Sequence, residues 1–175
     1  MKKIINDIIV VEGKSDACLL SSFIDGEIIT TNGLDCNKET LEYLKLASKF
    51  KKILILTDPD DAGLTIRQKI KENVNNVFVI SANIDYCNKH NKHGIAESSK
   101  KYLNDLLCKY YSNTKIQKFI DKHDVNSLVH DYKINKNDIC KAYNIGSVSL
   151  KTITTRLNTL QITKNMVLGK FNYEN

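Results

Sequence analysis

The first 80 residues alternate short apolar runs with amphipathic segments. The apolar runs predict strands at residues 7–12, 27–31, 52–57 and 77–80. Between them, apolar positions at helical spacing predict helices at residues 15–24, 38–50 and 61–72. Strands that alternate with helices require crossover connections, and therefore a parallel sheet covered by helices on both faces. We expect an α/β, Rossmann-like fold in which ligands bind beyond the carboxyl ends of the strands.

The pattern changes after residue 80. Residues 81–95 are polar and aperiodic, which indicates a loop, and a helical pattern returns at residues 96–111. Beyond it, three short helices are expected at residues 115–122, 136–143 and 149–160. We therefore expect two domains: residues 1–108, which hold the sheet, and residues 109–175, a small helical domain.

Polar side chains follow two of the predicted strands. Glu12 ends the first strand, and Asp58 and Asp60 come directly after the third. Because buried parallel strands deliver their last residues to one edge of the sheet, we expect these carboxylates to lie close together. Carboxylate oxygens suit Mg²⁺, which usually shares one or two protein carboxylates with water and substrate phosphates. The sequence thus predicts a site for one or two Mg²⁺ ions and phosphodiester chemistry.

These acids leave alternatives open. The Asp-Pro-Asp segment also fits a helix start, where acids cap free amides, and we assign that capping role to Asp61. Glu12 can act as a general acid or base near a scissile phosphate, or ligate the metal directly. Asp16 and Glu97 are possible additional acids of the site, but each also fits the first turn of a helix.

The excess positive charge lies in the C-terminal part of the chain. The formal net charge is +6; residues 1–107 carry 15 Lys/Arg and 15 Asp/Glu, whereas residues 108–175 carry 11 and 5. A basic module beside a neutral one suits a nucleic-acid enzyme, because lysines that replace phosphate counterions add affinity without reading sequence. Lys and Asn are abundant throughout, so compositional bias is the alternative explanation.

Several residues have the chemistry to bind a phosphate backbone or a base. The planar guanidinium of Arg67 suits phosphate, and a surface ion pair is the alternative for this residue. Asn32-Gly33 follows a predicted strand, and an ordinary turn is the alternative for this pair. Tyr132 and Tyr143 can stack on exposed bases. Cys87, His90 and His93 offer only three ligands at a spacing that is not a recognised zinc finger, so we assign His93 to a polar loop that faces the substrate. The candidates for substrate binding are Lys14, Asn32, Gly33, Arg67, His93, Lys141, Lys151 and Arg156.

The sequence carries no evident targeting or membrane signal. The apolar stretch after Met1 is interrupted by Asn6 and Asp7 and leads to no small-residue cleavage site, and no apolar run has membrane-spanning length. The five cysteines include no Cys-x-x-Cys pair, which favours reduced thiols. We expect a cytoplasmic protein without a membrane partner.

Glu12-Gly13 after one apolar run, and Asp58-x-Asp60 after another, resemble the Toprim fold shared by topoisomerases, primases and some nucleases. More narrowly, the chain resembles the family of small bacterial ribonucleases that trim precursor 5S ribosomal RNA, ribonuclease M-five. The matching segments are Val10-Val11-Glu12-Gly13-Lys14, Thr31-Asn32-Gly33, Leu56-Thr57-Asp58-Pro59-Asp60 with Gly63 and Ile66-Arg67, Gly94-Ile95 with Glu97, and in the tail Gly146, Arg156-Leu157-Asn158 and Ile162-Thr163-Lys164.

This resemblance implies a Toprim catalytic domain followed by a basic helical RNA-binding domain. It implies a Mg²⁺-dependent endoribonuclease that cuts a double-stranded stem of precursor 5S rRNA, with a general acid/base role for Glu12. A 5S-binding ribosomal protein of the large subunit is an implied helper. The alternatives are a non-catalytic 5S rRNA-binding or assembly protein on the same scaffold, and a Toprim nuclease that acts on another nucleic acid. The chain is too short for the further domains of a topoisomerase or a primase.

Overall fold

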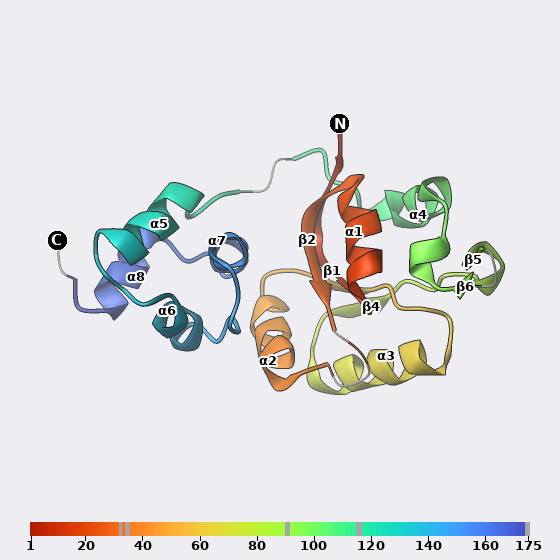
Figure 1. Ribbon diagram of the computed structural model, residues 1–175, viewed down its shortest axis with the longest axis horizontal. Helices are drawn as coiled ribbons and strands as arrows, with labels where there is room; N and C mark the ends of the chain where they lie inside the picture. Colours follow the sequence, from red (N-terminus) through yellow and green to blue (C-terminus); the bar gives the residue numbers. More distant parts are fainter. Residues whose placement is uncertain (32, 34–35, 90–91, 115–116, 174–175) are drawn as a thin grey trace. The chain divides into compact units, whose positions relative to one another are not determined.

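The computed structural model describes the chain except residues 32, 34–35, 90–91, 115–116 and 174–175, and omits the side chains of residues 88–89 and 92–93. The chain folds into two compact units, Met1–Ile116 and Gln117–Asn175. Figure 1 shows both units and labels most of their helices and strands. The boundary expected after residue 108 falls just beyond α4 (Lys100–Leu107), eight residues before the first unit ends.

A four-stranded parallel sheet forms the centre of the first unit (Figure 1). The strand order is β2-β1-β3-β4, and every neighbouring pair is parallel. The bounds are β1 (Lys3–Val11), β2 (Ile24–Thr30), β3 (Ile53–Ile55) and β4 (Val77–Val79). The α/β class predicted from the alternating pattern is confirmed.

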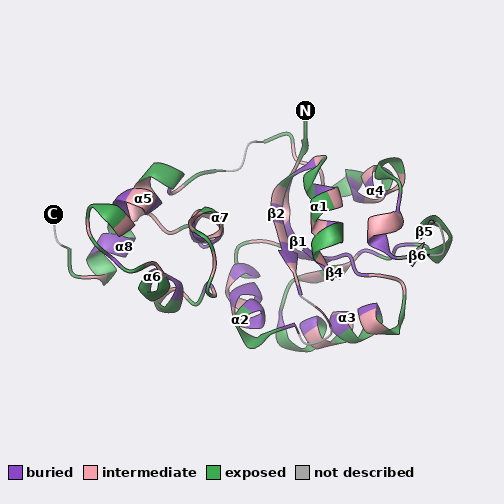
Figure 2. Ribbon diagram, viewed as in Figure 1, coloured by how far each residue is buried: buried purple, intermediate pink, exposed green. Residues whose placement is uncertain are grey.

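Helices cover both faces of this sheet (Figure 1). On one face, Ile9 and Val11 of β1 pack in a core with side chains of α1 (Lys14–Ser21) and α4. On the other lie α2 (Lys38–Ala47) and α3 (Asp61–Asn73), which contact each other. Figure 2 shows α2 buried along one side and exposed along the other. Because β1 is covered on both faces, Ile8 to Val11 are all buried, and the apolar run ends where the sheet ends.

Between β4 and α4 the chain forms short elements rather than a featureless loop. They are η1 (Ile84–Tyr86), β5 (Asn88–Lys89), β6 (Lys92–His93) and η2 (Ile95–Glu97), with η3 (Cys108–Tyr110) following α4. β5 and β6 pair antiparallel. Cys87 and Ile95 of this segment are fully buried in the core beneath α1 and α4, so the segment is built into the first unit.

The second unit is helical. Its helices are α5 (Lys122–His130), α6 (Lys136–Ala142), α7 (Leu150–Thr159) and α8 (Lys164–Lys170). The helix expected at residues 115–122 is wrong, because residues 117–121 are not helical and Asp121 caps α5 instead. α5 contacts both α7 and α8, and Val125, Leu128 and Leu157 are fully buried.

The cysteines are consistent with the expectation of reduced thiols. All five are free; Cys36, Cys87 and Cys140 are buried, and Cys18 and Cys108 are exposed. In the part of the chain that the structure describes, no helix combines the length and apolar character needed to cross a bilayer.

Candidate active site

Glu12 lies at the carboxyl end of the central strand. β1 ends at Val11, and the Leu56 amide donates to the Val10 carbonyl at 2.8 Å, so the chain beyond β3 still runs beside β1 here. Glu12 is half-buried, and its Oε2 atom is buried without a hydrogen-bond partner among the described residues. A buried carboxylate oxygen without a partner is costly unless another group satisfies it.

Asp58 follows β3, and a backbone turn holds its side chain. The Ile95 amide donates to Asp58 Oδ1 at 2.6 Å. Gly94, the residue before it, has φ +139°, and a Cβ atom on Gly94 would lie 2.7 Å from Asp58 Oδ2. The missing side chain of Gly94 therefore leaves space beside the second carboxylate oxygen.

Asp60 is the N-cap of α3. Its Oδ1 accepts the Gly63 amide at 2.7 Å, whereas Asp61 is the first residue of the helix. The capping role that we assigned to Asp61 thus belongs to Asp60, because Asp60 keeps the extended backbone that a cap requires.

Asp16 is buried in the first turn of α1. Its Oδ2 accepts the amide of Gly13, the N-cap of α1, at 2.8 Å. Asp16 therefore has the first-turn role that the sequence left open, and its helix also contacts η2.

The four acids act on one another through their charges. Burial raises the pKa of Glu12, and Asp58, Asp60 and Asp16 raise it further. Burial likewise raises the pKa of Asp58 against the opposing effect of the Ile95 amide. The pKa of Asp16 is also raised by burial, although the Gly13 amide lowers it. The site thus concentrates negative charge that no described salt bridge neutralises.

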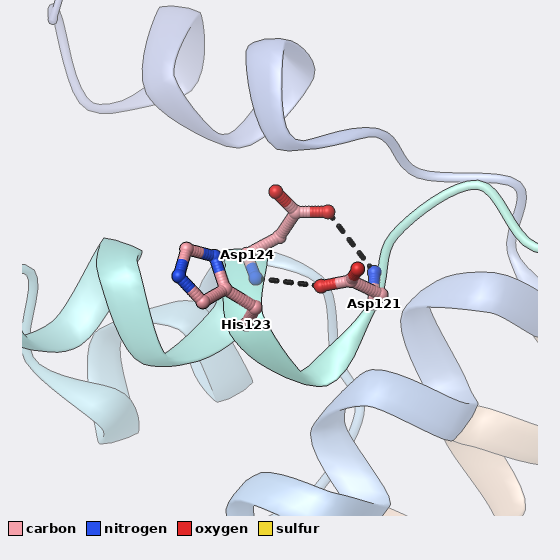
Figure 3. Close-up of side chains that lie close together, drawn as sticks. All are labelled: Asp121, His123 and Asp124. Atoms are coloured by element: carbon pink, nitrogen blue, oxygen red, sulfur yellow. Dashed lines mark hydrogen bonds between the residues drawn. The ribbon is translucent and has the colours of Figure 1, made fainter.

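The acids do not form a closed cage. Among the described residues, Asp121, His123 and Asp124 form the one group of three whose ligand atoms all lie within 4.8 Å of one another. Figure 3 shows why they lie close: Asp121 accepts the Asp124 amide at 2.8 Å, and Asp124 accepts the Asp121 amide at 3.1 Å. We interpret this exposed group as the capping box of α5.

The site in the first unit nevertheless fits Mg²⁺. Glu12 offers a buried oxygen without a partner, Asp58 has an oxygen beside the space at Gly94, and Asp60 uses one oxygen for its cap. The donors are all carboxylate oxygens, which a hard cation prefers, and an open arrangement suits Mg²⁺ because this ion keeps several of its waters.

Arg67 is hydrogen-bonded to the chain segment that carries Asp58. Its Nε donates to Thr57 Oγ1 at 2.8 Å, and its Nη2 donates to the carbonyls of Thr57 at 3.1 Å and Asp58 at 2.6 Å. These contacts differ from the phosphate contact that we expected. They fix the turn that carries Asp58.

The other candidates in this unit occupy varied positions. Lys14 is exposed as the first residue of α1, and Gly33, at φ +100°, follows β2. Glu97 is half-buried on η2. Asn32 and the His93 side chain lie outside the described part of the structure.

The candidates in the second unit divide into exposed and buried cations. Lys141 on α6 and Lys151 on α7 are exposed. Arg156 is buried, and its Nη1 donates to the Ile145 carbonyl, so it holds the segment between α6 and α7 instead of offering its charge to RNA. Lys164 lies 5.4 Å from the Tyr132 ring and Lys170 lies 4.7 Å from the Tyr143 ring, which places cations directly on the two aromatic residues proposed to stack on bases.

Comparison with known proteins identifies the family. Residues 7–109 match the Toprim domain. The chain is 37% identical over 172 residues to ribonuclease M5 of Mycoplasma mycoides subsp. mycoides SC, covering 90% of this chain and 92% of that protein. It is 33% identical over 173 residues to ribonuclease M5 of Borreliella burgdorferi, covering 91% and 90%. A solved small TOPRIM domain protein from Bacillus stearothermophilus is 20% identical, with a TM-score of 0.48 over 60% of this chain and 85% of that one. This chain therefore belongs to the ribonuclease M5 family of Toprim-domain proteins.

Proposed function

We propose that the chain is a Mg²⁺-dependent endoribonuclease that hydrolyses phosphodiester bonds in a double-stranded stem of precursor 5S rRNA and thereby yields mature 5S rRNA. The observation that carries the proposal is the buried, unpartnered Oε2 of Glu12 in a group of acids at the strand ends. Such a group repels a phosphate backbone unless cations intervene. The family relationship supports the choice of RNA as the substrate.

Glu12, Asp58 and Asp60 would hold one or two Mg²⁺ ions. When bound, Mg²⁺ neutralises charge on the phosphate and lowers the pKa of a bound water. The raised pKa of Glu12 suits this residue to accept a proton from water or to return one to the leaving oxygen. Asp58 keeps its carboxylate in a fixed position because the Ile95 amide holds Oδ1.

Substrate binding would involve both units. Lys14, Asn32, Gly33 and His93 are our candidates in the first unit, and the exposed Lys141 and Lys151 are candidates in the second unit. Their charges would hold phosphates without reading sequence. We further propose a cytoplasmic location, where precursor 5S rRNA is found, and a 5S-binding ribosomal protein as a helper that shapes the RNA.

A cleavage assay tests this proposal. Purified protein and an Asp58→Asn variant are incubated with precursor 5S transcript and Mg²⁺, and RNA binding is measured in parallel. We expect cleavage by the wild type alone, with RNA binding by both. Equal cleavage by both proteins would remove the proposed site. Binding without cleavage by the wild type would instead identify a non-catalytic 5S rRNA-binding protein.

A further inference from the structure

We propose that the backbone turn at residues 94–96 is a positioning element of the active site. In this turn the Ile95 amide holds Asp58, and Gly94 keeps open the space where a cation reaches Asp58. This inference rests on the proposed function, because it assigns a role to the turn in binding the catalytic cation. From the sequence, residues 81–95 were expected to form a polar loop, and Glu97 was a possible additional acid of the site.

The turn holds one carboxylate and lies beside the helix that carries another. The Ile95 amide donates to Asp58 Oδ1 at 2.6 Å, and η2, which includes Ile95 and Ala96, contacts α1, the helix of Asp16. A hydrogen bond to a charged acceptor is stronger than one between neutral groups. A backbone donor also has no side-chain rotamers to lose. The turn therefore fixes the side chain that follows β3 and packs beside the helix that carries Asp16.

The turn is itself held from both sides. The Gly94 amide donates to the Cys87 carbonyl at 2.8 Å, and the Glu97 amide donates to the Gly94 carbonyl at 3.1 Å. The side chains of Cys87 and Ile95 are fully buried in the core under α1 and α4. Because these anchors lie in the core, the turn can transmit the rigidity of the sheet and its helices to the Asp58 carboxylate.

Gly94 leaves the second oxygen of Asp58 accessible. Its φ of +139° is a conformation that L-residues rarely adopt, and a Cβ here would lie 2.7 Å from Oδ2 and 3.1 Å from Oδ1 of Asp58. With Oδ1 engaged by the Ile95 amide, Oδ2 is the atom that remains for a cation. Groups that orient a metal ligand in this manner affect metal affinity about 10- to 100-fold.

Two substitutions at Ile95 separate the amide from the side chain. Ile95→Pro removes the donor, and proline is accommodated at the first position of a helical turn after the extended Gly94. Ile95→Ala keeps the donor and also loses buried apolar volume, so it controls for the effect on packing. The readouts are Mn²⁺ affinity by calorimetry on the full-length protein, the urea midpoint, and kcat and KM for RNA cleavage.

We expect Ile95→Ala to lower the urea midpoint and to retain Mn²⁺ affinity within about threefold of the wild type, whereas Ile95→Pro binds Mn²⁺ about 10- to 100-fold more weakly. The same difference should appear in kcat, with KM changed little. Equal Mn²⁺ affinity and equal kcat for the two variants would overturn the proposal.

A second pair tests the space beside Gly94. Gly94→Ala places a methyl group against Asp58, whereas Gly146→Ala in the second unit also places an L side chain at a positive φ, +69°. Only Gly94→Ala should weaken Mn²⁺ binding. Loss of Mn²⁺ binding in both variants would assign the effect to strain and overturn the role of the space. A wild type that neither binds Mn²⁺ nor cleaves RNA would refute the proposed function itself, which distinguishes that failure from failure of the turn alone.

Discussion

Glu12, Asp16 and Asp58 lie in surroundings that disfavour their charged forms. Burial raises the pKa of each, and the neighbouring acids add to the effect at Glu12 and Asp58. A carboxyl group whose pKa is higher in the folded protein than in the unfolded chain binds protons first in the folded protein. The contribution of such a group to stability therefore increases as the pH falls. Without a cation, the site costs the fold stability at neutral pH.

This cost predicts the effect of neutralising Asp58. Without divalent cations at pH 7, Asp58→Asn should have a larger free energy of unfolding than the wild type, since the amide can still accept the Ile95 hydrogen bond. The gain should shrink as the pH falls toward 3.8, the ordinary pKa of the carboxyl group. Urea titrations of both proteins across this range measure the difference. A gain that grows on acidification would show that the pKa of Asp58 is lowered instead.

Arg67 and Lys14 should have different kinetic roles. Arg67→Lys loses the planar fork that spans Thr57 and Asp58, so kcat should fall about tenfold or more while KM stays within about threefold. Lys14→Ala should mainly raise KM, because the exposed Lys14 is a candidate phosphate contact. Steady-state kinetics on the precursor transcript distinguishes the two. If Arg67→Lys raised KM alone, Arg67 would be a substrate contact, as the sequence had indicated.

At the residue scale, the positions of the acids at strand ends could be predicted from the sequence, whereas the groups that hold their side chains could not. Carboxylates after apolar runs are visible in the sequence because strand ends are visible there. The partners of Arg67 are backbone carbonyls, and their directions depend on how α3 meets the turn. The donors to Asp58 and Asp16 are likewise backbone amides, which every residue except proline carries. No residue type identifies these amide donors in a sequence. The glycine at position 94 is the one local signal that the backbone here approaches another group closely.

At the element scale, the approach of α3 to the catalytic turn depends on Gly63. A Cβ at this position would lie 2.1 Å from the Asp58 carbonyl oxygen and 3.0 Å from Thr57 Oγ1. The Gly63 amide also binds Asp60, and its carbonyl accepts the Thr57 hydroxyl at 3.2 Å. The start of α3 is therefore packed directly on the backbone that carries the acids.

Gly63→Ala should push α3 away from this turn. We expect a loss of about 1–3 kcal/mol in the free energy of unfolding, as for other overpacked positions. Gly169→Ala on α8 is the matched control: nothing lies within 4 Å of its new Cβ, and alanine favours a helix interior by about 0.5–1 kcal/mol over glycine. Urea denaturation measures both. Unchanged stability in Gly63→Ala would contradict the close packing of α3.

The elements themselves were predictable where their patterns were long or bounded by clear signals. The parallel sheet was predicted correctly because the residues of β3 and the last four residues of β1 are buried and read as apolar runs. The helices of the second unit were harder to predict. A helix was expected at residues 115–122, but Asp121 is the N-cap of α5, so the helix begins at Lys122 instead. α8 is only seven residues long. Short helices owe their stability to packing, which a local pattern does not contain.

At the scale of the whole molecule, the helical second unit is the more basic one: residues 1–116 carry 17 Lys/Arg and 15 Asp/Glu, whereas residues 117–175 carry 9 and 5. Lys141 and Lys151 are exposed and carry part of the excess charge. If they contact phosphates, replacing each by Gln should reduce the slope of log Kd against log salt concentration by about 0.9. Lys45→Gln on α2 is the control, because Lys45 pairs with Glu42 at 3.1 Å. Filter binding to precursor 5S transcript measures the slopes. Equal slopes for all variants would exclude Lys141 and Lys151 from the RNA interface.

The central claim is that Glu12 and its neighbouring acids form a cation-dependent site for RNA cleavage. The most direct test is the single-turnover rate on precursor 5S transcript, as a function of Mg²⁺ concentration, for the wild type and for Glu12→Gln. We predict a saturable Mg²⁺ dependence for the wild type and a rate lower by about 10²- to 10⁴-fold for the variant, with RNA affinity retained. Cleavage by Glu12→Gln at the wild-type rate, or a wild-type rate independent of Mg²⁺, would contradict this account.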